Sequence, residues 1–139
     1  MKLDERSFYI GKHVGEIKAW CVAAKNGFKE LGLSDPFKPE DYQVLLPYME
    51  EEATRYGVSY RLEEDLPTTD LFPDMDLTGH WVFLIYKKPE IIERYDELKR
   101  DYERLIREGG YVGIARKKVA VRLGRLLGYS EESIHIRWS

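Results

Sequence analysis

Residues 81–110 constrain the fold of this chain most strongly, because they place a buried strand directly before an amphipathic helix. The six apolar and aromatic residues Trp81–Tyr86 predict a strand that is covered on both faces. Pro89 suits the first position of a helix, and Gly109-Gly110 ends that helix. The apolar side chains between them recur along one helical stripe: Ile91, Tyr95, Leu98, Tyr102 and Leu105. We therefore expect a sheet that is covered by helices.

The first quarter of the chain has weaker local signals. Residues 7–24 contain strand-like segments on both sides of Gly11 and Gly15, which predicts a hairpin or two successive strands. Residues 16–24 also have a helical alternative, because their apolar residues would share one helical face: Ile17, Trp20, Cys21 and Ala24. Asn26-Gly27 then predicts a turn.

The middle of the chain is interrupted by prolines. Residues 32–41 have the composition of a loop. Pro47 would interrupt a helix, so we expect a short turn at 40–46 and a helix over 47–56 that Gly57 ends. Residues 58–62 alternate as a strand.

The last third of the chain is predicted to be helical. A second amphipathic helix is expected over 112–127, and Ser130 suits the cap of a final short helix. The predicted buried stripe of the 112–127 helix consists of Val112, Ala115, Val119, Leu123 and Leu126. Strands gathered early and helices late are typical of the α+β class. We expect a small antiparallel sheet of about four strands covered by three to four helices.

Composition predicts a single α+β domain over residues 1–139, whose hydrophobic content of 43% can supply its core. Cys21 is the only cysteine, which excludes an internal disulfide and a metal site made of several cysteines. The longest apolar run, Trp81–Tyr86, is far shorter than the roughly 20 residues of a membrane span. We therefore expect a cytoplasmic protein without a membrane partner. The single asparagine and glutamine and the 34% of charged residues indicate a thermophilic source.

The charge is unevenly distributed along the chain. Residues 110–139 hold six cations against two carboxylates, although the whole chain has a net charge of −3. Within this basic helical segment, glycines lead into a helix whose first turns carry cations, an arrangement that can hold an anion. The candidate anion-binding residues are Gly110, Gly113, Arg116, Lys117, Lys118, Arg122 and Arg125. The structural alternative is a turn between two helices with solvated side chains.

An acidic connection at 63–80 contains a second candidate site. Asp70, Asp74 and Asp76 lie close to His80, and no lysine or arginine interrupts this stretch. Hard divalent cations prefer several oxygen ligands, so these four residues could bind a metal ion. No other cofactor is evident. The structural alternative is a solvated acidic loop that keeps a neighbouring sheet edge from pairing.

Residues 123–134 have the spacing of a helix-turn-helix motif, because Gly124, Gly128 and Ile134 stand at its characteristic positions. Such a motif would place the start of its second helix against DNA. Here that start carries Glu131 and Glu132, which would repel phosphates. A helical hairpin that buries its apolar residues explains the same pattern, so nucleic acid is the weaker interpretation.

Three functional hypotheses follow from these features. The first is an accessory or ligand-binding protein whose basic segment contacts a phosphate-bearing ligand or nucleic acid; carboxylate pairing of Lys118, Arg122 and Arg125 would remove its support. The second is a metal-dependent enzyme acting on a phosphorylated or carboxylated small molecule through the acidic loop. The third is a homodimer that uses the 91–105 stripe or an exposed strand edge. Nucleophilic catalysis by Cys21 has little support, because this cysteine lies in an apolar run.

Overall fold

The computed structural model describes the backbone of residues 4–71 and 77–138, with side chains described up to Ile134. Helices lie on both sides of a small sheet whose three strands run antiparallel in the order β1-β3-β2. The elements are α1 (Glu5–Lys25), β1 (Leu31–Leu33), the 3-10 helix η1 (Pro39–Asp41), α2 (Tyr42–Tyr56), β2 (Ser59–Glu63), β3 (Val82–Tyr86), α3 (Pro89–Glu108), α4 (Gly113–Leu126) and α5 (Glu131–Trp138). The α+β class is thus confirmed.

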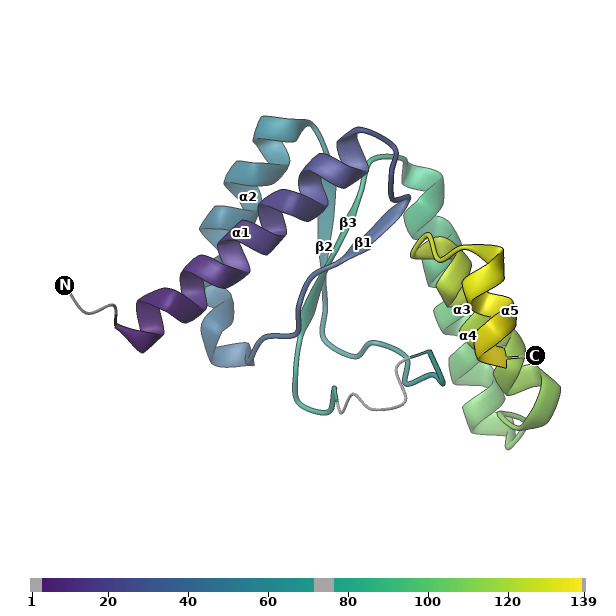
Figure 1. The fold of residues 1–139 in the computed structure, drawn as a ribbon. Helices are drawn as coiled ribbons and strands as arrows, with labels where there is room; N and C mark the ends of the chain where they lie inside the picture. Colours follow the sequence, from purple (N-terminus) through teal and green to yellow (C-terminus); the bar gives the residue numbers. More distant parts are fainter. Residues whose placement is uncertain (1–3, 72–76, 139) are drawn as a thin grey trace.

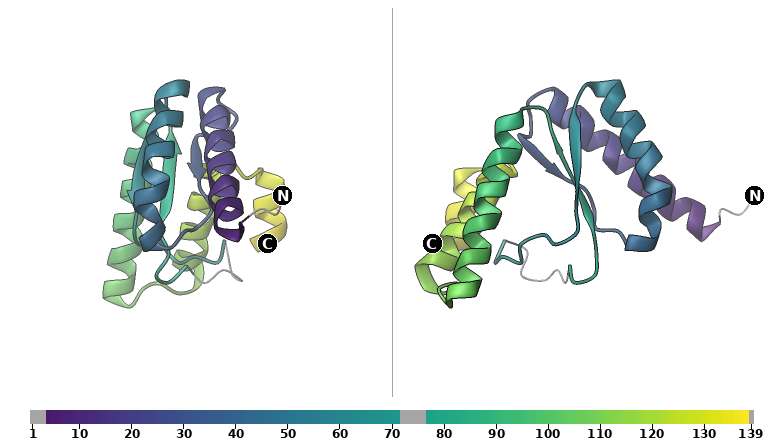
Figure 2. Two further views of the ribbon diagram at one scale, coloured as in Figure 1. Left: turned by 90° about the vertical axis from the view of Figure 1, so that its left-hand side faces the viewer. Right: turned by 180° about the vertical axis from the view of Figure 1, so that it is seen from behind.

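Two helical layers enclose the sheet. Helices α1 and α2 lie on one side, and α3, α4 and α5 lie on the other (Figures 1 and 2). The central strand β3 is buried on both faces, as its continuous apolarity predicted. Successive side chains of a strand point to opposite faces. Accordingly, Phe83 and Ile85 join the core under α1 and α2, whereas Val82 and Leu84 join the core under α3 and α4.

The prediction of strands within residues 7–24 is wrong, because these residues form the single helix α1. Asp4 caps the helix by accepting a hydrogen bond from the backbone N–H of Arg6. The helical alternative for residues 16–24 was the correct one, and Ile17 and Cys21 are buried as it required. Apolar side chains also lie on the exposed side of α1, Phe8 among them, so the sequence pattern shows little helical periodicity. Packing against α2 and the sheet overrides the strand propensity.

The predicted numbers of strands and helices are also slightly wrong, because the described residues form three strands and five α-helices. The short strand β1 lies within a stretch partly predicted as loop, and it forms only by pairing with β3 in the register Leu31↔Tyr86. Helix α2 begins at Tyr42 and continues through Pro47, which was expected to interrupt it. Gly57 ends this helix in the left-handed conformation, as predicted, with φ +66°.

The C-terminal helices agree closely with their local signals. Helix α3 spans the predicted 89–108, and its stripe packs into the core: Ile91, Tyr95 and Leu98 are buried, and Tyr102 and Leu105 are partly buried. Helix α4 buries most of its predicted stripe, but Val112 is 66% exposed and lies before the helix. The Ser130 hydroxyl accepts the backbone N–H of Ser133 at the start of α5. Gly124 packs against Ile134, which supports the helical hairpin. No helix in the described ranges is long and apolar enough to cross a bilayer.

Candidate functional site

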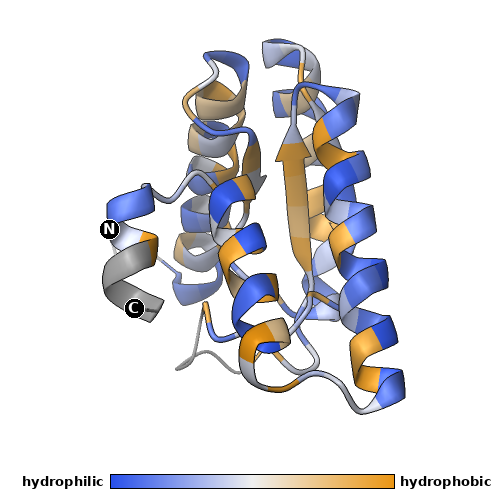
Figure 3. Ribbon diagram, turned by 90° about the vertical axis from the view of Figure 1, so that its right-hand side faces the viewer, coloured by the Kyte–Doolittle hydropathy of each residue, from blue (hydrophilic) through white to orange (hydrophobic). Residues whose placement is uncertain are grey.

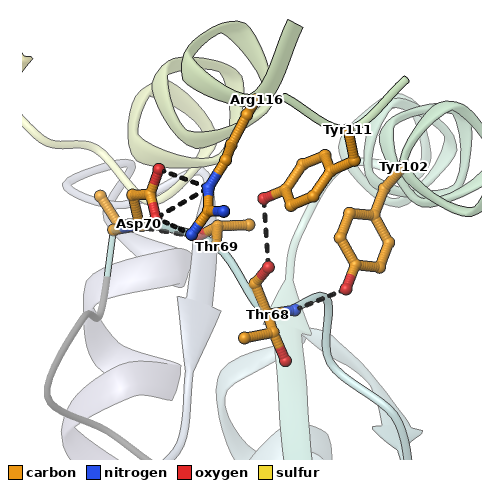
Figure 4. A network of polar contacts seen from close by, with 7 residues as sticks. Thr68, Thr69, Asp70, Tyr102, Tyr111 and Arg116 are labelled. Carbon is orange, nitrogen blue, oxygen red and sulfur yellow. Dashed lines mark hydrogen bonds and ion pairs between the residues drawn. The ribbon is translucent and has the colours of Figure 1, made fainter. Parts of the chain in front are cut away.

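Two residues predicted for different sites bind each other. Arg116, an anion-binding candidate, forms a two-pronged ion pair with Asp70, a metal-binding candidate (Figure 4). The Nε–Oδ2 distance is 2.9 Å, and the Nη2–Oδ1 distance is 2.7 Å. The guanidinium also lies over the Tyr111 ring, 5.4 Å from its centroid. The two charges neutralise each other, so neither side chain is free for a ligand. The same contact anchors the connection between β2 and β3 to α4.

Two tyrosines hold the same connection beside the ion pair. The Tyr111 hydroxyl donates to the backbone carbonyl of Thr68 at 3.1 Å, and the Thr68 N–H donates to the Tyr102 hydroxyl at 3.3 Å (Figure 4). The two rings meet edge to face with centroids 5.0 Å apart. Burial raises the pKa of Tyr111 to about 12, so its hydroxyl stays protonated and keeps donating well above neutral pH. We interpret this network as structural.

The remaining basic candidates divide into paired arginines and unpaired lysines. Arg122 binds Asp101 at 2.8 Å, and Arg125 binds Glu131 at 2.8 Å. Lys117 and Lys118 are exposed and have no carboxylate partner among the described residues. Of the glycines, Gly113 begins α4 with φ +55°, and Gly110 packs beside Leu105. Among the side chains that the structure describes, the capacity of the basic segment to bind an anion therefore rests on its two lysines.

The metal-site residues are only partly described. Asp74 and Asp76 lie outside the described residues, and Asp70 is bound to Arg116. The Nδ1 atom of His80 lies 3.2 Å from the Thr78 carbonyl oxygen. Among the residues that the structure describes, no three histidine, cysteine or carboxylate side chains gather as a metal would require.

Cys21 and His13 lie on the buried face of α1. The Cys21 side chain is fully buried in the core, and burial raises the pKa of its thiol to about 11. Burial also lowers the pKa of His13, whose ring lies 4.5 Å from that of Tyr9. At neutral pH these groups are a thiol and a neutral imidazole, both packed within the fold.

An apolar cavity of about 180 Å³, called here the Trp20 cavity, lies beside the edge strand β1. It lies between α1, the start of β3, the connection that precedes β3 and the segment after α4. Its walls are mostly apolar and come from distant parts of the chain: Trp20, Leu33, Pro36, Leu66, Leu77, Val82, Leu127 and Tyr129, with Ser34, Lys29 and Asp35 as polar residues. An apolar pocket with few polar groups is the usual form of a small-molecule site.

One wall of the Trp20 cavity is fixed by the half-buried carboxyl group of Glu16. The indole N–H of Trp20 donates to Glu16 Oε1 at 3.3 Å, and the backbone N–H of Asp35 donates to the same oxygen. Burial and the neighbouring Asp35 carboxylate raise the pKa of Glu16 to about 8. Gly32 allows the indole to lie against β1, because a Cβ there would come within 3.1 Å of the Trp20 ring. Trp20 is therefore held in place at the cavity.

The opposite wall contains the cation of the Trp20 cavity. The Lys29 ammonium donates to the backbone carbonyl of Leu127 at 3.1 Å and lies 5.9 Å from the Tyr129 ring centroid. Gly128 has φ +81°, and a Cβ at this position would meet the Lys29 side chain at 3.0 Å. Lys29 has no carboxylate partner among the described residues, so this half-buried cation lacks a counter-ion there.

Sequence reasoning missed this cavity because its residues carry no shared motif. Lys29 and Leu127 are separated by 98 positions, and their contact depends on the packing of α4 against the sheet. The only local signals were the glycine turns at Gly27 and Gly128. These turns predict chain reversals and say nothing of a binding site.

Comparison of the chain with protein-family models, with curated proteins and with solved structures gives no significant match. The functional argument therefore rests on the geometry and chemistry of the described residues.

Proposed function

We propose that this protein binds a small carboxylate with an apolar body in the Trp20 cavity. The observation that carries the proposal is the Lys29 ammonium, which lies without a carboxylate partner among the described residues at the wall of a mostly apolar space. An apolar body would displace water from this space, and a carboxylate would supply the missing counter-ion. Asp35 is exposed at the rim, so water and salt screen its repulsion of the anion.

The size of the Trp20 cavity limits the ligand. A protein cavity of roughly 150 Å³ lined by aliphatic side chains can hold benzene. The Trp20 cavity, at about 180 Å³, is therefore suited to a single aromatic ring or a short branched chain with one polar group. Phenylacetate is a probe of this class, and its isosteric amide, phenylacetamide, lacks the charge.

Nuclear magnetic resonance titration tests the proposal, because the chain has three tryptophans whose indole N–H signals can be followed separately. Phenylacetate is expected to shift the Trp20 signal and to leave that of Trp81 unchanged, because Trp81 packs against Tyr42 and does not line the cavity. Phenylacetamide should bind about tenfold more weakly, which corresponds to about 1.4 kcal/mol. Phenylalanine carries an ammonium group that phenylacetate lacks. A higher affinity for phenylalanine would mean that Asp35 binds this ammonium group.

Lys29→Met retains most of the side chain and removes its charge. We expect this variant to bind phenylacetate and phenylacetamide with similar, weak affinity, whereas Lys12→Met, a change on the exposed side of α1, should preserve the preference for phenylacetate. The ratio of the two affinities is measured within each variant, so a small loss of stability does not affect the conclusion. Equal affinity for both probes in the wild-type protein would contradict the role of Lys29.

A second candidate function is contact between the basic segment and an anionic partner. It is supported by Lys117 and Lys118, which are exposed and have no carboxylate partner in the described part of the chain. The paired arginines contribute less, because a partner would first have to break their ion pairs. Salt-sensitive binding of duplex DNA or inorganic phosphate, weakened by Lys117→Gln with Lys118→Gln, would support this candidate.

A further inference from the structure

The turn between α3 and α4 gathers exposed aliphatic side chains at one corner of the molecule. Ile106 is 52% exposed, Val112 is 66% exposed and Ile114 is 73% exposed. The turn forms the lower end of the helical layer in Figure 1, and apolar segments lie on both sides of it in Figure 3. This corner, defined by residues 106–118 and called here the α3–α4 tip, therefore presents apolar surface to solvent.

The exposed aliphatic side chains of Val112 and Ile114 are not explained by a role in folding. Val112 occupies the N-cap position of α4, and its side chain makes no capping hydrogen bond. Serine, threonine, aspartate or asparagine at an N-cap would stabilise the helix by about 1 kcal/mol relative to an aliphatic residue. Ile114 lies on the solvent side of α4, opposite the buried residues Val119 and Leu123. Both residues thus leave apolar surface exposed without stabilising the fold.

The same tip carries positive charge that is not neutralised within the protein. Arg107, Lys117 and Lys118 are exposed, and none has a carboxylate partner among the described residues. Between residues 104 and 118 the only carboxylate is Glu108. The start of α4 also carries the partial positive charge of a helix N-terminus, and its first backbone N–H groups can donate to a phosphate oxygen.

We infer that the α3–α4 tip docks on an anionic lipid surface, with Val112 and Ile114 entering the boundary between headgroups and acyl chains and Lys117 and Lys118 meeting the lipid phosphates. This inference rests on the second candidate function, a basic segment that meets an anionic partner, and names that partner. A phospholipid surface offers phosphates directly above an apolar layer, which matches cations beside protruding aliphatic side chains. Duplex DNA presents phosphates without an apolar layer that these side chains can reach.

Vesicle flotation with the full chain tests the inference. The protein is mixed with phosphatidylcholine vesicles, or with vesicles in which about 30% of the lipid is phosphatidylglycerol. We expect binding to the anionic vesicles only, with affinity that falls as salt is raised. Equal binding to both kinds of vesicle, or binding to neither, would overturn the lipid assignment.

Two pairs of substitutions separate the apolar and the charged contributions. Lys117→Gln with Lys118→Gln should lower affinity about thirtyfold, since each basic residue near an anionic membrane contributes roughly fivefold. Val112→Ser with Ile114→Ser should lower it at least about tenfold, through lost apolar burial. All four side chains are exposed, so the lysine variants should unfold at the wild-type temperature. The Val112→Ser variant should unfold at the same or a higher temperature, because serine can cap α4. The matched control is Lys12→Gln with Lys18→Gln on the exposed side of α1, which should bind as the wild type does.

The remaining outcomes distinguish this inference from the function on which it rests. Salt-sensitive binding of duplex DNA without vesicle binding would retain an anionic partner and overturn the lipid assignment. Binding of neither DNA, phosphate nor anionic vesicles would overturn both. A dimer in solution that Ile114→Ser dissociates, without vesicle binding, would assign the tip to a second copy of the chain and overturn the inference.

Discussion

Replacing Glu16 by glutamine should remove a loss of stability that the wild-type protein suffers as pH rises. The Glu16 carboxyl is held between α1 and the loop after β1, where Oε1 accepts the Trp20 indole N–H. Its Oε2 atom is buried and has no hydrogen-bond partner among the described residues. Burial, followed by the neighbouring Asp35 carboxylate, raises the pKa of this carboxyl from 4.5 to about 8. Glutamine keeps the shape and the acceptor oxygen but does not titrate.

The sign and size of the effect follow from proton binding. Between pH 4.5 and about 8 the unfolded chain loses the Glu16 proton while the folded protein keeps it. The stabilisation from this group is therefore complete below pH 4.5 and is lost as pH rises through about 8. One unit of pKa difference corresponds to about 1.4 kcal/mol, which sets an upper bound of about 5 kcal/mol. Glu16 is only half-buried, so solvent screening reduces the expected loss to about 1–2 kcal/mol.

Urea unfolding at about pH 5 and about pH 8.5 measures this difference. From the lower to the higher pH, Glu16→Gln should gain about 1–2 kcal/mol in free energy of unfolding relative to the wild type. Other titrating groups, such as His13, are common to both proteins and cancel in the comparison. The exposed Glu93→Gln on α3 is the matched control and should follow the wild type. Parallel pH profiles for Glu16→Gln and the wild type would refute the assigned pKa and its cause.

Two further substitutions test the packing around the sites. Tyr95→Phe removes the hydroxyl that donates to the buried Glu63 at 2.6 Å. This substitution should lower the free energy of unfolding, measured in urea, by about 1–3 kcal/mol. An unchanged value would mean that water replaces the Tyr95 hydroxyl as a hydrogen-bond donor to Glu63. Gly128→Ala forces a strained backbone against Lys29 and should both destabilise the protein by about 1–2 kcal/mol and weaken phenylacetate binding. The matched control is Gly11→Ala in α1, where an added Cβ would meet no atom of another part of the fold within 4 Å. This control should stabilise the protein by about 0.5–1 kcal/mol. Retained phenylacetate affinity in Gly128→Ala would contradict the contact between this glycine and the lysine.

The parts of the fold that sequence predicted well are those with strong local signals. The bounds of α3 follow from Pro89, Gly109 and one apolar stripe, each of which acts within a few residues. The burial of β3 follows from its continuous apolarity. In α1, by contrast, apolar residues lie on several sides of the helix, so helical and strand patterns could not be separated from sequence.

Sequence identified which side chains are charged but not which of them are neutralised. Arg116 and Asp70 were assigned to different sites, yet they form one ion pair across 46 positions of the chain. Lys117, the next residue along α4, stays unpaired among the described residues because it points away from the packed face. The availability of a charge thus depends on what a fold brings opposite to it.

Sequence alone determined the fold class and the bounds of the helices with strong local signals, because periodicity, proline and glycine act through neighbouring residues. Only the tertiary structure decided that β1 pairs with β3 and that Lys29 reaches the carbonyl of Leu127. It also decided that the Trp20 cavity remains beside these contacts. These contacts join residues far apart in the chain, and their free energy arises only when both partners are already placed by the rest of the fold.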